Sequence, residues 1–145
     1  MAHLARNDLD MDALGQDLAE DEGERLTMYR CSMGFNTVGI GHNMDARPIS
    51  KRASRVIFED DVQDCLKDLD RAVPWWRSLS EGRQRALANL CFNMGITRLL
   101  GFRNMLAALH KGDYKRAAAE CLDSKWVRQV QESRINRIVR LIKEG

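Results

Sequence analysis

The chain has 145 residues and a mass of 16.6 kDa, with 44% hydrophobic residues, 30% charged residues and a formal net charge of only +2. This composition supports one compact domain with a buried core and excludes a disordered chain. No apolar run approaches the roughly 20 residues that span a membrane, and residues 1–18 lack the apolar segment of a signal peptide. We therefore expect synthesis in a cytoplasm, no stable membrane insertion, and another route to any target outside it.

The four cysteines are widely spaced and form no C-x-x-C pair. This spacing argues against a zinc site or a disulfide framework, so we expect no metal and no cofactor. Cys65, Cys91 and Cys121 fall in helical apolar patterns and are predicted to be small core residues. Cys31 does not fit such a pattern.

The first predicted element is an N-terminal helix. Its apolar residues recur at helical spacing: Met11, Leu14 and Leu18. Asp8 or Asp10 can cap its start, and Gly23 can end it. Glu22 would then lie at the helix C-terminus, where the macrodipole disfavours a negative charge, as suits a proton donor.

Residues 24–49 predict a small antiparallel sheet lobe. Leu26 and Met28 alternate with polar neighbours, and residues 37–41 are extended with two glycines, Gly39 and Gly41, that allow a close approach. A sheet this small needs support from the rest of the chain.

The remainder of the chain is predicted to be helical. Ser50 caps a connecting helix over residues 50–73, which Pro74 ends after about 35 Å. Residues 74–145 form a helical lobe that also includes the N-terminal helix. Its helices are predicted to follow Ser80, to run through residues 102–109, to follow Asp113, to run through residues 125–130, and to follow Ser133.

Three residues with chemically reactive side chains lie close together in the first part of the chain. Eight residues separate Glu22 from Cys31, and five separate Cys31 from Thr37. Cleavage of a glycosidic bond needs a proton donor for the leaving oxygen and a second group that activates water or attacks the sugar. An acid at a helix end, facing a thiol and a hydroxyl on a hairpin, suits that chemistry.

This spacing resembles the signature of the phage-type lysozymes and endolysins (glycoside hydrolase family 24), which include T-even phage lysozyme. That signature is Glu, eight residues, Asp or Cys, five residues, and Thr. Residues 21–23 and 37–42 are also typical of the family. Further similar segments lie at 86–95 and 101–102, and weaker ones at 117–118, 124–126 and 133–134. Together they cover nearly the whole chain from residue 19.

The resemblance implies an α+β, lysozyme-like fold over residues 1–145. A small antiparallel sheet lobe and a larger helical lobe are joined by a long helix, with the active-site cleft between them. It also implies a muramidase that cleaves peptidoglycan between N-acetylmuramic acid and N-acetylglucosamine. Glu22 corresponds to the general acid, Cys31 to the second catalytic residue, and Thr37 to the residue that helps to hold the attacking water.

Five further residues match positions that support such a site. Phe92 and Asn93 match the cleft-facing part of the central helix, although Phe92 also fits a core position. His42 matches a histidine that pairs with an acid on the long helix, for which Asp61 is the candidate; a purely structural ion pair is the alternative. Arg134 matches an arginine that faces the catalytic glutamate, or else lies on a solvated helix face.

The chain departs from the T-even pattern in three places. Cys31 replaces an aspartate, and its thiol could act as a base on water or as a nucleophile; oxidants would then affect activity. The loop after His42 is shorter, so the cleft is expected to be more open. Met105 offers no polar contact to a sugar.

The expected partner is bacterial peptidoglycan, bound by a monomer that does not bind nucleic acid. In the leading interpretation the enzyme is an endolysin, made in the host cytoplasm and released to the periplasmic wall through a holin-type pore. The alternatives are a lytic transglycosylase on a related fold and a non-catalytic peptidoglycan-binding module. Basic residues gather near the C-terminus, on a solvated face or on a surface that attracts anionic polymers: Lys125, Arg128, Arg134, Arg137, Arg140 and Lys143.

Overall fold

The computed structural model describes residues 8–145, and the chain divides into two compact units, Met1–Ser54 and Arg55–Gly145. The boundary falls inside α2 (Lys51–Ala72), the helix predicted to connect two lobes. The prediction of one domain, with the N-terminal helix in the helical lobe, concerns how the units pack together and stays a prediction.

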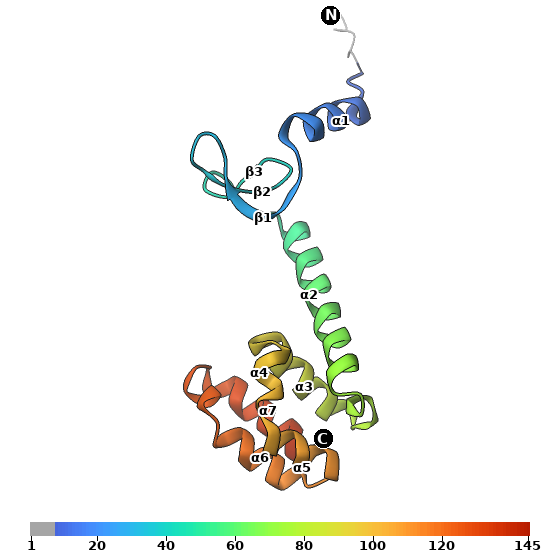
Figure 1. Ribbon diagram of the computed structural model, residues 1–145, viewed down its shortest axis with the longest axis vertical. Helices are drawn as coiled ribbons and strands as arrows, with labels where there is room; N and C mark the ends of the chain where they lie inside the picture. The colour runs from blue at the N-terminus through green and yellow to red at the C-terminus, as the bar shows by residue number, and fades with distance from the viewer. Residues whose placement is uncertain (1–7) are drawn as a thin grey trace, which may run out of the picture. The chain divides into compact units, whose positions relative to one another are not determined.

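Residues 8–145 form seven α-helices, two short 3-10 helices and one three-stranded sheet, so the predicted α+β class is confirmed (Figure 1). In chain order the elements are α1 (Met11–Glu22), β1 (Arg25–Arg30), β2 (Asn36–Gly39), β3 (His42–Asn43), α2 (Lys51–Ala72), η1 (Trp76–Ser78), α3 (Glu81–Met94), α4 (Ile96–Leu100), α5 (Arg103–Lys111), α6 (Tyr114–Leu122), η2 (Lys125–Arg128) and α7 (Glu132–Glu144). None of these helices has both the length and the apolar character that a membrane crossing requires.

The sheet of the first unit is an antiparallel meander in the order β1-β2-β3. β1 pairs with β2 through the register Arg30↔Asn36, and residues 31–35 form the hairpin loop between them. The Asp45 carboxylate accepts hydrogen bonds from the backbone and side-chain nitrogens of Asn36, at 2.8 and 3.2 Å. The loop after β3 is therefore tied back to β2, which steadies a sheet that is too small to be stable alone.

Four of the predicted helix caps are confirmed. The side chains of Asp10, Ser50, Ser80 and Asp113 each accept a hydrogen bond from the backbone nitrogen three residues further on. Such a bond satisfies one of the free N–H groups in the first helical turn.

The cap predicted at Ser133 is wrong. α7 begins at Glu132, and the residue in the cap position is Gln131, whose backbone is extended and whose side chain makes no capping hydrogen bond. Ser133 already lies inside the first turn, where its own backbone is helical and cannot serve as the cap. The helix predicted over residues 125–130 is the short 3-10 helix η2.

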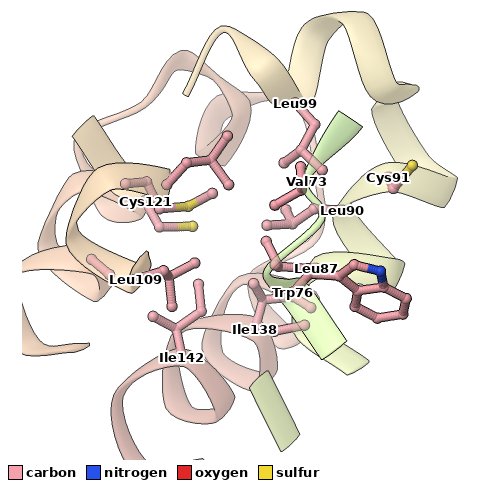
Figure 2. Close-up of a cluster of buried hydrophobic side chains, with 14 of the residues drawn as sticks. Val73, Trp76, Leu87, Leu90, Cys91, Leu99, Leu109, Cys121, Ile138 and Ile142 are labelled. Atoms are coloured by element: carbon pink, nitrogen blue, oxygen red, sulfur yellow. The ribbon is translucent and has the colours of Figure 1, made fainter. Parts of the chain in front are cut away.

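The hydrophobic core of the second unit lies where α3, α5, α6 and α7 meet. α7 packs against both α3 and α6, and α6 packs against α5. The residues at the centre of this core include Leu87, Leu90, Leu109, Cys121, Ile138 and Ile142 (Figure 2). As predicted, Cys91 and Cys121 are buried in it, whereas Cys65 is half-buried at its edge.

Candidate functional site

Glu22 is the last residue of α1, as predicted, and its side chain is exposed to solvent. The helix ends there because Gly23 follows with a φ of 68° and donates its N–H to the carbonyl of Ala19 at 2.9 Å. The carboxyl group lies against the backbone of Gly41, two residues after the end of β2. The first unit therefore brings this acid to the sheet.

Cys31 begins the hairpin loop between β1 and β2 and is half-buried. The loop closes because the N–H of Cys31 donates to the Phe35 carbonyl at 2.9 Å and the N–H of Gly34 donates to the Cys31 carbonyl at 2.8 Å. Hydrogen bonding from the Phe35 backbone lowers the pKa of the Cys31 thiol, with smaller contributions from the backbone at Met33, the Thr37 hydroxyl and Gly34; partial burial opposes this shift. Converging N–H groups of this kind favour an anion, here the thiolate.

Thr37 lies in β2 and is almost fully buried, with 3% of its surface exposed. Its hydroxyl donates to the carbonyl of Phe35 at 2.9 Å, so one carbonyl ties both Thr37 and Cys31 to the hairpin. The hydroxyl has a single proton, which it can donate instead to Cys31 once the thiol has ionised. The structure therefore brings Cys31 and Thr37 together, as their spacing predicts.

His42 lies in β3, and its Nε2 atom is buried without a hydrogen-bond partner among residues 8–145. A buried polar atom without a partner carries a free-energy cost, which an acidic partner would remove. The predicted partner, Asp61, is an exposed residue of α2 in the second unit. Their pairing joins the two units and stays a prediction.

Phe92 and Asn93 are consecutive exposed residues near the C-terminus of α3. Phe92 is 42% exposed and contacts the ring of Phe58, with ring centroids 5.9 Å apart, so it is not a core residue. The Oδ1 atom of Asn93 accepts a hydrogen bond from Nε1 of the buried Trp126 at 2.7 Å. This bond orients the Asn93 amide with its NH₂ group free to donate. A role for either residue in binding substrate stays a prediction.

Arg134 lies in the first turns of α7 and donates from Nε to Oδ1 of Asn89 at 2.9 Å. It borders a groove of about 520 Å³ between α2, α3 and α7, together with Arg85 and Arg137. Arg134 is therefore held against α3 and is not a freely solvated side chain. Its predicted position opposite Glu22 joins the two units and stays a prediction.

A second pocket in the helical unit, of about 410 Å³, has both polar and apolar walls. Met105, expected to offer no polar contact, lines it while being 1% exposed. The other lining residues include Phe102 and Trp126, the cations Arg98, Arg103 and Lys125, and the acids Glu120 and Asp123. The sequence did not predict this pocket, because its lining residues are spread between Met94 and Gln129 and share no local pattern.

The family model for phage lysozyme matches residues 19–140. The chain belongs to the phage lysozyme family. The resemblance predicted from Glu22, Cys31 and Thr37 is therefore confirmed, and the chain is a lysozyme-type glycoside hydrolase. Membership of this family also makes peptidoglycan its substrate class.

Several curated relatives agree with this placement. The endolysin of Salmonella phage P22 is 32% identical over 70% of this chain and 73% of its own length. The probable T4-type lysozyme 1 of Dictyostelium discoideum is 27% identical over 88% of this chain and 92% of its own length. The pre-baseplate central spike protein Gp5 of Enterobacteria phage T4 is 30% identical over 92% of this chain, which spans 28% of that protein.

Proposed function

We propose that this phage lysozyme hydrolyses the β-1,4 bond between N-acetylmuramic acid and N-acetylglucosamine in peptidoglycan. The observation that carries the proposal is the family match over residues 19–140, which includes Glu22, Cys31 and Thr37. In support, these three residues belong to one compact unit. Glu22 has the role of the proton donor to the leaving glycosidic oxygen.

Cys31 has the second catalytic role, and two reaction routes are open to it. As a base, the thiolate takes a proton from water, which attacks the anomeric carbon and inverts its configuration. As a nucleophile, the thiolate bonds to the anomeric carbon first, and water then releases the sugar with retained configuration. The lowered pKa of the thiol supports both routes, because both need the thiolate.

Thr37 helps to place the attacking water. Its only proton is donated to the Phe35 carbonyl, or to Cys31 once the thiolate has formed, so in either case its oxygen lone pairs are what it can offer to a water molecule. Thr37 therefore orients the water by accepting a hydrogen bond from it.

The biological role we infer is that of an endolysin: a monomer made in the host cytoplasm that reaches the periplasmic wall through a holin-type pore and lyses the cell. The similarity to the P22 endolysin supports it. A second candidate is a wall-cleaving segment of a phage-particle protein, since 92% of this chain is similar to part of a protein named as a central spike. Detection of the chain in purified particles, rather than free in the lysate, would favour the second role.

The deciding experiment compares Glu22→Gln with Glu24→Gln in clearing suspensions of permeabilised bacteria. Loss of a general acid typically costs about 10²- to 10⁴-fold in rate, so we expect that loss for Glu22→Gln. Glu24 is also an exposed carboxylate, two residues away, and its variant should clear at the wild-type rate. A folded Glu22→Gln variant with wild-type activity would remove Glu22 from the mechanism.

Mass spectrometry of the products separates hydrolysis from the transglycosylase alternative. Hydrolysis leaves a reducing N-acetylmuramic acid end, whereas transglycosylation leaves an anhydro end that is lighter by one water. The anomeric configuration of the first product, measured by NMR, then distinguishes the base role of Cys31 (inversion) from the nucleophile role (retention).

A further inference from the structure

Two glycines on either side of Ile40 have nearly the same positive φ angle. Gly39 has a φ of +67° and Gly41 has a φ of +66°. Residues with a side chain rarely adopt this region, so the backbone alone favours glycine at both positions. The positive φ therefore makes substitution of either glycine unfavourable.

The two glycines differ in what a side chain would meet. A Cβ atom built on Gly39 has no other atom within 4 Å. A Cβ atom built on Gly41 would lie 2.8 Å from both Cδ and Oε2 of Glu22, and 3.0 Å from its Cγ. Carbon–carbon contacts are most favourable at about 3.5–4.0 Å, so no Cβ can share this space with the Glu22 carboxyl.

We infer that Gly41 is a positioning residue for the proton donor: its bare Cα is the surface against which the Glu22 carboxyl rests. This rests on the proposed function, in which Glu22 is the general acid. Within residues 8–54 no hydrogen bond or ion pair holds that carboxyl. Contact with Gly41 is therefore a restraint that this unit places on the end of a long, exposed side chain.

A Cβ atom on Gly41 would displace the Glu22 side chain rather than the backbone. The Glu22 side chain is flexible and exposed, so it would rotate away from the new methyl group at little cost in folding stability. The proton donor would then lie away from the leaving oxygen. Because a displacement of about 1 Å at a reacting group can cost about 10²-fold in rate, the loss should appear in catalysis rather than in stability.

The test compares Gly41→Ala with Gly39→Ala in the full chain. We expect both variants to lose Tm, since both positions have a positive φ that a side chain disfavours. Gly41→Ala should lose about 10- to 100-fold in kcat on soluble peptidoglycan fragments, while its KM stays within about threefold of the wild-type value. Gly39→Ala should keep kcat within about threefold of wild type.

Asparagine variants provide a second pair if either alanine variant does not fold. Asparagine tolerates positive φ better than alanine does, so Gly41→Asn and Gly39→Asn introduce a Cβ with less backbone strain. The same difference in kcat is expected between them.

Equal kcat for the two positions, or a loss at Gly41 that lies wholly in KM, would overturn the positioning role. That failure is distinct from failure of the proposed function. If Glu22→Gln stays active, the proposed function fails; if Glu22→Gln is inactive while the Gly39 and Gly41 variants have equal kcat, only the positioning role of Gly41 fails.

Discussion

Replacement of Arg83 by Met tests what holds the C-terminal helix α7 to α3. The Arg83 guanidinium donates from Nε to the Ile142 carbonyl at 2.8 Å and from Nη2 to the Lys143 carbonyl at 3.0 Å. These carbonyls lie in the last turn of α7, where no intrahelical N–H is available to them. The guanidinium also stacks on Tyr114, 3.4 Å from the ring centroid. Met keeps the apolar contact with that ring and removes every donor.

The expected loss of stability is about 2.5–3 kcal/mol. A hydrogen bond from a charged group contributes about 1.5–3 kcal/mol, and we count only the partly buried bond to Ile142 at the low end of that range. The exposed bond to Lys143 is screened by solvent and adds about 0.5 kcal/mol. The cation–π contact adds about 0.5–1 kcal/mol. At about 3 °C per kcal/mol for a chain of this size, Tm should fall by about 8–9 °C.

The assay is thermal unfolding followed by the helical circular dichroism signal, with Arg85→Met as the matched control. Arg85 lies on the same helix but makes only an exposed ion pair with Glu81, at 2.7 Å. Such i,i+4 pairs contribute about 0.3–0.5 kcal/mol, so its variant should melt within about 2 °C of wild type. Equal shifts for the two variants would show that the contacts of Arg83 with α7 contribute nothing specific.

Three further predictions concern the site. Iodoacetamide near neutral pH should alkylate Cys31 before Cys91, because hydrogen bonding within its loop lowers the pKa of the Cys31 thiol whereas burial raises the pKa of Cys91 to about 12. Since only the thiolate reacts, labelling of Cys31 should slow as the pH falls below that lowered pKa. Peptide mapping measures the rate of labelling at each cysteine. Labelling of Cys91 before Cys31 in the folded protein would contradict the prediction. Cys31→Asp should retain turnover, because aspartate is the other residue of the signature, while Cys31→Ser should lose at least about 10²-fold in kcat; a fully active serine variant would exclude a chemical role for the thiol. Trp126→Phe removes the hydrogen-bond donor to Asn93 and should lower the free energy of unfolding by about 1 kcal/mol, measured by denaturant unfolding. It should also raise KM, because the Asn93 amide is no longer oriented. An unchanged KM would show that Asn93 does not contribute to substrate binding.

Local sequence was sufficient for most of the helix starts and for the spacing of Glu22, Cys31 and Thr37, but it did not predict α4. The caps at Asp10, Ser50, Ser80 and Asp113 depend on residues within one helical turn, and the structure has all four. The cap at Ser133 failed because serine is also accepted inside the first turn, so the residue type alone did not locate the start of α7.

Sequence alone was enough for the α+β class, which depends on composition and periodicity, and for the intervals between Glu22, Cys31 and Thr37, which carry the resemblance to the family. The contact of Gly41, and not Gly39, with the Glu22 carboxyl depends on tertiary packing, since the two φ angles are nearly equal and only a neighbour distant in sequence distinguishes the positions. The same holds for the bond between Asn93 and Trp126, which are 33 residues apart. Such contacts depend on how the chain packs, and no local pattern of residues encodes them.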